Sequence, residues 1–287
     1  MGPLAAKPIT LQFLLGAYRE MADLPKSRAA LYERGCLDLC REPDRERREQ
    51  QARRPSGRDL EPKACLAVAS RIAAAMLFGN RAAVTVGDEA DDAHLEDIVV
   101  PDLAGGEEGG DPSVRGGTDE IRTALRGGLF VARGRGRLSF AHRSYAEFLA
   151  ARYVLKAPVE QIKSLLTDSG SKGPGLVPQL WEVAAWLAGA REDLFSWIVS
   201  TEPEVLLRGD TATLHPELLA RLVAAVLTRL EADELPETWE LRDAYPRLAH
   251  AGLAGQLEPF LLGKAKKVGP RRAAIYMAEA CRVVALQ

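Results

Sequence analysis

One histidine stands where it could contact an anion. Residues 138–155 read LSFAHRSYAEFLAARYVL, a β-like run followed by helix-forming residues. Ser144 and Glu147 fit the capping box S-x-x-E, which predicts a helix that begins at Ser144, two residues after His142. Because the start of a helix attracts anions, an imidazole there can donate to a phosphate oxygen. The structural alternative is a ring that packs on Tyr145 or bonds a backbone carbonyl.

Three arginines suggest a second kind of contact. Residues 132–137 read ARGRGR and place Arg133, Arg135 and Arg137 on an expected hairpin. A winged helix that binds DNA uses such arginines on phosphates. The nearby helices lack the Asn, Gln and Lys residues usual for base readout, and the formal net charge is −2, so nucleic acid is the less favoured partner. In the structural alternative, the arginines are solvated or pair with acidic neighbours.

The other reactive residues form no recognisable catalytic or metal site. The four cysteines, Cys36, Cys40, Cys65 and Cys281, contain no C-x-x-C pair and lie far in sequence from the histidines, which favours free thiols over a metal site. Residues 84–91 read VTVGDEAD, but the P-loop that a helicase needs is missing, so we interpret the acids as a solvated loop or the start of a helix. Adjacent acids in such stretches cannot hold a fixed separation, which excludes glycosidase chemistry. We expect no enzyme activity from this chain alone.

The composition is that of a globular protein. The chain has 287 residues, of which 47% are hydrophobic, enough for two or three small domains. Its first residues lack the pattern of a signal peptide, and no run approaches the roughly 18 apolar residues of a membrane span. We therefore expect a cytoplasmic protein with no membrane partner.

The first half of the chain alternates helix-forming and polar segments. Residues 9–21 predict a helix, and a second helix follows Ser27, a plausible N-cap, and runs to Cys40. Residues 41–59 are highly charged with almost no apolar side chain, which indicates a linker. A helix over 65–78 and a β-like run over 82–86 come next, and a glycine-rich stretch over 104–117 is expected to be flexible.

The middle of the chain predicts a winged helix-turn-helix domain. A helix capped by Thr118 precedes two β-like runs, LFVAR and RLSFA, joined by a GRG turn, and the long helix follows. Helix, hairpin and helix in this order are typical of that fold.

The chain beyond residue 158 predicts one helix after another. Trp181 and Trp186 are about 500° apart on a helix, so they face different sides, as in helices sandwiched between neighbours. The last expected helix, within 270–286, stays apolar to its end, so we expect the solenoid to continue past Gln287. We predict a mainly α fold of four parts: a helical subdomain (1–42), a charged linker (43–62), a winged-helix domain with a short β-hairpin (63–157) and a HEAT-like helical-repeat tail (158–287).

The segment around His142 resembles the end of the winged-helix domain in NACHT-type STAND NTPases. That family has a strand, F-x-H, a serine and then E-F/Y-L-A-A, and the matching residues here are Phe140, His142, Ser144, Glu147, Phe148, Leu149, Ala150 and Ala151. The stretch PITLQFLLGAYREMADLPKSRAALYERGCLDLC is similar to the helical domain of the same family. The resemblance covers roughly residues 5–157.

The resemblance implies two nucleotide contacts. In the family, the winged-helix histidine contacts the β-phosphate of ADP and holds the molecule closed, while a proline of the helical domain lies against adenine. These roles fall to His142 and Pro8. The family's proline usually follows G-x, whereas Ala6 and Lys7 precede Pro8 here.

No G-x-x-x-x-G-K-[ST] occurs in the sequence, so ADP or ATP is expected only together with a nucleotide-binding domain outside this chain. We expect the regulatory part of a STAND NTPase: a nucleotide-state switch coupled to a ligand on the helical tail, with oligomerisation on activation, in bacterial antiviral defence or signalling. The alternatives are a DNA-binding winged-helix regulator and a helical-repeat scaffold for protein interactions.

Overall fold

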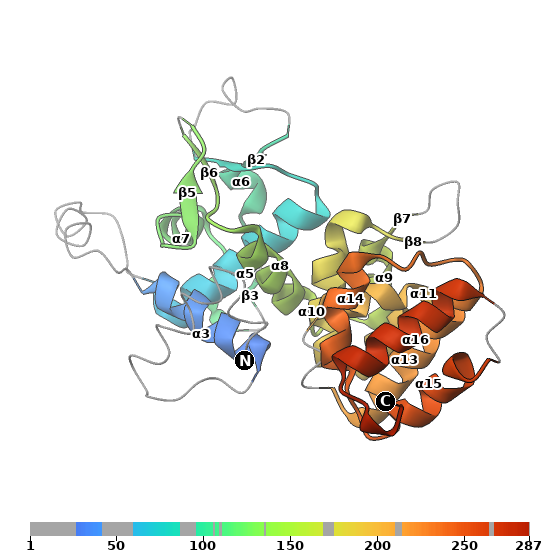
Figure 1. Ribbon diagram of the computed structural model, residues 1–287. Coiled ribbons are helices and arrows are strands. Elements are labelled where there is room, and N and C mark those ends of the chain that lie inside the picture. The colour runs from blue at the N-terminus through green and yellow to red at the C-terminus, as the bar shows by residue number, and fades with distance from the viewer. Residues whose placement is uncertain are drawn as a thin grey trace. The chain divides into compact units, whose positions relative to one another are not determined.

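The computed structural model describes residues 27–41, 60–86, 96–105, 107–108, 111–134, 136–168, 175–209, 214–263 and 267–286. The protein is mainly helical, with a small mixed sheet (Figure 1). It divides into two compact units, residues 1–165 and 166–287. The sequence-based boundaries after residues 42, 62 and 157 are finer than this division and stay a prediction. Pro8 and the helix expected over residues 9–21 lie outside the described residues, as does most of the charged linker.

The first unit combines helices with the sheet. Its elements are α3 (Arg28–Cys40), α5 (Pro62–Phe78), β1 (Val84–Thr85), β2 (Ile98–Val99), α6 (Val100–Leu103), β3 (Glu107–Glu108), β4 (Asp111–Arg115), α7 (Thr118–Ala124), β5 (Phe130–Ala132), β6 (Arg137–Phe140), α8 (Arg143–Val154) and α9 (Val159–Leu166), which ends at the boundary. The order of helices and strands around the predicted hairpin is confirmed.

Helix α5 is the centre of the first unit. It packs against α3, α7 and α8, and Figure 1 shows α8 beside it. The sequence explains this position, because Pro62 starts the helix and the alanines that follow let neighbouring helices approach closely. Leu66, Ile72 and several alanines are fully or almost fully buried. The buried hydroxyl of Ser70 donates to the carbonyl of Leu66 at 2.7 Å, so this polar group is satisfied inside the helix.

The sheet has the strand order β2-β1-β6-β5. Strands β5 and β6 form the predicted antiparallel hairpin, in which Phe130 pairs with Phe140. Strand β6 also pairs antiparallel with β1, and β2 runs parallel to β1. The rings of Phe130 and Phe140 lie 4.4 Å apart on the buried side of the hairpin.

Two local predictions in this unit need correction. The glycine-rich segment 104–117 contains the paired strands β3 and β4, because antiparallel pairing satisfies backbone groups without needing apolar side chains. Helix α7 begins at Thr118, but its N-cap is Gly117, one residue earlier than expected, and no side-chain hydrogen bond caps it. The cap predicted at Ser27 is confirmed, since its hydroxyl accepts from the N–H of Ala30 at 3.1 Å.

The described residues of the second unit are helical apart from the short strand pair β7–β8. Its elements are β7 (Thr167–Asp168), β8 (Gly175–Leu176), η2 (Pro178–Leu180), α10 (Trp181–Ala190), α11 (Glu192–Thr201), α12 (Pro203–Leu206), α13 (Pro216–Glu231), α14 (Trp239–Ala244), η4 (Tyr245–Leu248), α15 (Leu253–Leu261), α16 (Val268–Ala280) and η5 (Val284–Leu286). Helix α13 contacts α11, α12, α15 and α16, and it buries leucines and valines along one face. The last helix is shorter than predicted, because Arg282 adopts a positive φ of 53° just after α16 and the chain leaves the helix there.

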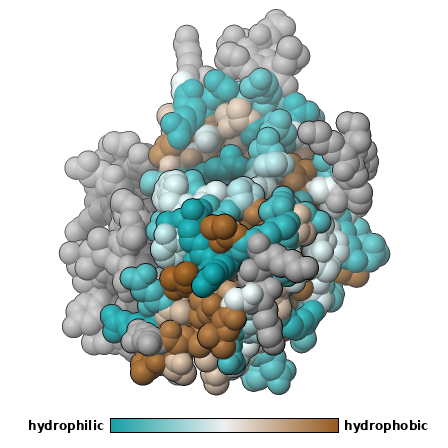
Figure 2. Space-filling model, turned by 45° about the vertical axis from the view of Figure 1, so that its right-hand side comes forward, coloured by the Kyte–Doolittle hydropathy of each residue, from teal (hydrophilic) through white to brown (hydrophobic). Residues whose placement is uncertain are grey.

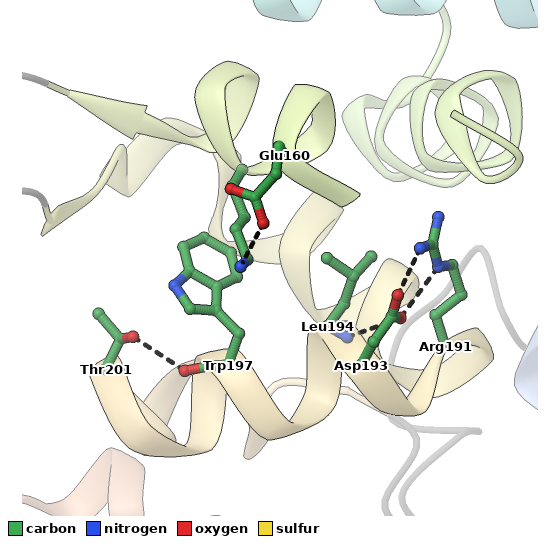
Figure 3. Close-up of polar contacts among 7 residues, drawn as sticks. Glu160, Arg191, Asp193, Leu194, Trp197 and Thr201 are labelled. Carbon is green, nitrogen blue, oxygen red and sulfur yellow. Dashed lines mark hydrogen bonds and ion pairs between the residues drawn. The ribbon is translucent and has the colours of Figure 1, made fainter. Parts of the chain in front are cut away.

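Local polar contacts lie near both ends of α11 (Figure 3). Asp193 in its first turn accepts from the Arg191 guanidinium at 3.0 and 2.5 Å and from the N–H of Leu194 at 2.9 Å. The hydrogen bond with Arg191 lowers the pKa of the Asp193 carboxyl. At the other end, the hydroxyl of Thr201 donates to the carbonyl of Trp197 at 2.8 Å. The acidic Asp193 near the N-terminus of the helix interacts favourably with the helix dipole.

Apolar areas at the surface are interrupted by polar ones on the face drawn in Figure 2. The most exposed large apolar side chains of the second unit are Trp239, Leu262, Val268, Ile275 and Val284. Single exposed apolar residues are normal in globular proteins. No helix in the described parts of the chain is long and apolar enough to cross a membrane.

Candidate functional site

His142 lies at the junction between the hairpin and α8. Its backbone is extended, with φ −136° and ψ 137°, and it is the N-cap of α8. The N–H of Ala141 donates to the carbonyl of Leu129 at 2.8 Å, and the N–H of Tyr145 donates to the carbonyl of His142 at 3.1 Å. These two bonds hold the backbone of the histidine between the sheet and the helix. The position therefore belongs to rigid elements rather than to a loose loop.

The imidazole of His142 is exposed and lies edge-on to the Tyr145 ring. The two ring centroids are 5.4 Å apart at an angle of 75°. Tyr145 itself is buried, and burial raises the pKa of its phenol above the ordinary value. The packing of the His142 ring on Tyr145, which the sequence analysis gave as the alternative to an anion contact, is thus present. It leaves the nitrogen-bearing edge of the imidazole accessible to a ligand, since the residue is exposed.

The capping box predicted for α8 is wrong. The helix begins at Arg143, one residue before the predicted start, and no side-chain hydrogen bond caps it. The carboxylate of Glu147 instead accepts from Nε of Arg143 at 2.8 Å. The two residues are four positions apart, which lets them pair along one side of the helix, and the Glu147 side chain is only 10% exposed. The first-turn N–H groups next to His142 consequently lack a side-chain cap.

The start of α8 can attract an anion. Uncapped N–H groups and the helix dipole place partial positive charge there, while the charge of Arg143 is paired with the carboxylate of Glu147. An exposed imidazole beside them can supply a further N–H donor. The arrangement can bind a phosphate oxygen.

The arginines of the hairpin have separate positions. Arg133 is exposed, Arg135 is outside the described residues, and Arg137 is bound to Asp97. The Arg137 guanidinium donates to both carboxylate oxygens of Asp97, at 2.6 and 2.8 Å, and the hydroxyl of Thr85 donates to the same carboxylate at 3.2 Å. The hydrogen bond to Asp97 raises the pKa of Arg137. Arg137 therefore pairs with an acidic neighbour, which was the alternative to a contact with nucleic-acid phosphates.

Asp97 is a residue that the sequence did not reveal. Its side chain is 0% exposed. It binds Arg137 of β6, 40 positions later in the sequence, and Thr85 of β1, 12 positions earlier. A single aspartate before a short apolar run carries no signal of such a partner. Among the described residues, no group of three or more His, Cys, Asp or Glu side chains could hold a metal ion.

Comparison with models of protein families gives no match, and neither does comparison with curated proteins or with solved structures.

Proposed function

We propose that this chain is the regulatory part of a STAND-type switch, in which His142 contacts the phosphates of ADP bound by a separate nucleotide-binding domain. The observation that carries the proposal is the position of His142: exposed, on rigid backbone, and beside the uncapped start of α8. These features suit a residue that contacts an anion supplied from outside the unit.

The arrangement of the first unit supports the proposal. Helix α5 is followed by β1 and β2, helix α6, the strand pair β3–β4, helix α7 and the hairpin β5–β6, and the sheet places β6 between β1 and β5. A winged helix likewise has helices followed by a hairpin, which is its wing, so β2 and the β3–β4 pair would be additions to that fold. We extend the interpretation to the second unit as a stack of helices of the HEAT-like kind, which would carry the ligand-sensing surface.

The mechanism is a shift between two states rather than a reaction. If the imidazole of His142 donates to ADP only in the closed state, this hydrogen bond stabilises the closed state. A ligand that binds the helical tail more tightly in the open state shifts the equilibrium toward the open state. One hydrogen bond to a charged phosphate contributes about 1.5–3 kcal/mol. This corresponds to roughly a 10- to 100-fold change in ADP affinity.

The test joins a P-loop nucleotide-binding domain of the resembled family ahead of residue 1 and compares His142→Ala with the unchanged protein. We expect ADP to dissociate about 10-fold faster or more from the variant, with raised basal signalling. His215→Ala is the matched control, because His215 is also exposed and also stands as the N-cap of a helix, α13, with no side-chain capping bond. Equal ADP release from all three proteins would refute the switch.

A further inference from the structure

His250 lies in the turn that leads into α15, and both nitrogens of its ring are close to oxygen atoms. Nδ1 is 2.8 Å from the carbonyl oxygen of Leu248, the last residue of η4, and Nε2 is 2.9 Å from Oε1 of Gln256 in α15. Both distances are those of hydrogen bonds. The carbonyl of His250 also accepts from the N–H of Leu253 at 3.1 Å, which ties its backbone to the first residue of α15.

A second contact determines the orientation of the Gln256 amide. Nε2 of Gln256 donates to the carbonyl of Ala220 in α13 at 2.9 Å. A backbone carbonyl can only accept, so a reversed amide would place two acceptor oxygens against each other. Oε1 of Gln256 therefore faces His250, and this oxygen can also only accept.

Two acceptors at the ring of His250 require two N–H groups on it. A neutral imidazole carries one N–H and one lone pair, whereas the imidazolium carries two N–H groups. In a neutral ring, one nitrogen lone pair would point at an oxygen only 2.8 or 2.9 Å away, which is repulsive. Only the charged ring donates to Leu248 and Gln256 together.

We propose that His250 is a proton-dependent link: its charged ring joins the end of η4 to α15 and, through the amide of Gln256, to α13. Helix α15 packs against α13, so the link lies within the helical packing of the second unit (Figure 1). Histidine ordinarily changes its charge between about pH 5 and 8, which makes this packing sensitive to pH. The link has no part in the proposed contact of His142 with ADP.

The charged side chains nearest to these contacts along η4, α13 and α15 have other positions. Arg247 of η4 donates to two backbone carbonyls just after α12, and Arg221 of α13 donates to a hydroxyl of α11. Glu217 of α13 and Glu258 of α15 are exposed. Among the described residues, no ion pair joins His250 to an acid, and its two ring partners are neutral oxygens.

The effect on stability has a definite sign. The folded protein uses the proton of His250 in two hydrogen bonds, whereas the unfolded chain exposes the same ring to water. Proton uptake therefore stabilises the folded state, and stability rises as the pH falls from 8 to 5.5. The positive end of the α15 dipole opposes the charge, but this effect is smaller than that of two hydrogen bonds made by a charged group. We expect a net change of about 10-fold in the unfolding constant.

The first test is urea unfolding of the full chain at pH 8 and 5.5. The unfolding constant of the unchanged protein should fall about 10-fold more between these two pH values than that of His250→Gln. Gln256→Leu should also lose most of the dependence, because a neutral ring can then satisfy Leu248 alone. His215→Gln is the matched control, since His215 is exposed at the N-cap of α13, and it should keep the full dependence. An equal pH dependence of the unchanged protein and His250→Gln would overturn the link.

The second test uses the unchanged protein, so it stands even if a variant fails to fold. The chemical shifts of the ring nitrogens in protein labelled with ¹⁵N-histidine distinguish an imidazolium from a neutral ring. With the signals assigned through the backbone, His250 should show two protonated nitrogens at a pH where the exposed His215 already shows one. Loss of the proton from both residues at the same pH would refute the proposal. Neither test uses a nucleotide, so their failure is distinguishable from failure of the proposed switch.

Discussion

At the scale of single residues, the carboxylate of Asp97 is the clearest case of an interaction that holds the hairpin. It is fully buried, and its oxygens are occupied by the guanidinium of Arg137 and the hydroxyl of Thr85. A buried charge is tolerated only when it is paired and hydrogen-bonded in this way. The pair fixes β6 against β1, and β6 leads directly to His142.

Asp97→Asn keeps the shape of the side chain and removes its charge. We expect a loss of about 2–3 kcal/mol in the free energy of unfolding, because Arg137 loses its charged partner. Asp38→Asn is the control, since Asp38 is 31% exposed in its pairs with Arg34 and Arg41, and it should cost below about 1 kcal/mol. Urea unfolding measures both variants. Equal losses would show that the Asp97 pair contributes no more than a surface pair.

At the scale of elements, the turn between β5 and β6 depends on its glycines. Gly134 and Gly136 have φ angles of 125° and 70°, in the region that residues with a Cβ rarely adopt. The turn returns the chain so that the N–H of Arg133 donates to the carbonyl of Arg137 at 2.9 Å. The register of the hairpin, and hence the pairing of Phe130 with Phe140, follows from this turn.

Gly136→Ala should destabilise the protein by about 1 kcal/mol, because the new Cβ meets an unfavourable backbone conformation. Gly189→Ala is the matched control in α10, where φ is ordinary and a Cβ would meet nothing within 4 Å. That change should stabilise the protein by about 0.5–1 kcal/mol, because alanine favours the helix. Thermal unfolding of the two variants should shift in opposite directions, and a shift in the same direction would contradict this account.

At the scale of the whole molecule, the second unit is tied together by a buried ion-pair cluster. The side chain of Glu237 is 2% exposed and binds Arg242 of α14 at 2.5 Å and Arg272 of α16 at 2.6 Å. The Arg242 guanidinium also lies 4.0 Å from the centre of the Tyr276 ring. Segments distant in sequence are thereby joined at one carboxylate. The hydrogen bond with Arg242, then that with Arg272, lowers the pKa of Glu237.

This cluster predicts a pH dependence of stability. A carboxyl whose pKa is lowered by folding stabilises the protein above its ordinary pKa of 4.5, and the contribution is lost as the pH falls through the folded value. Glu237→Gln should therefore cost about 1–3 kcal/mol at pH 7 and progressively less below pH 4.5. Urea unfolding at pH 7, 4.5 and 3 measures the difference. A cost that does not change with pH would rule out the charge as its source.

Much of the local structure was predictable, since it depends on neighbours in sequence. The cap at Ser27, the hairpin and the apolar faces of α5 and α13 follow from residue type and spacing. The start of α8 was predicted one residue late, because the sequence could not show that Glu147 would bind Arg143 instead of capping the helix. Of the candidate site, the position of His142 at the strand–helix junction was predictable, and its exposure was not.

The sequence by itself determined most of the helices and the β5–β6 hairpin, because hydrogen bonds within a helix and pairing across a short turn are local interactions. Only the tertiary structure decided which side chains meet across long separations. It brought Asp97 to Arg137 and Glu237 to Arg272. Such partners are chosen by the packing of elements, and the packing depends on the shapes and charges of many side chains at once. The interaction with Asp97 therefore could not be predicted from the arginine-rich hairpin.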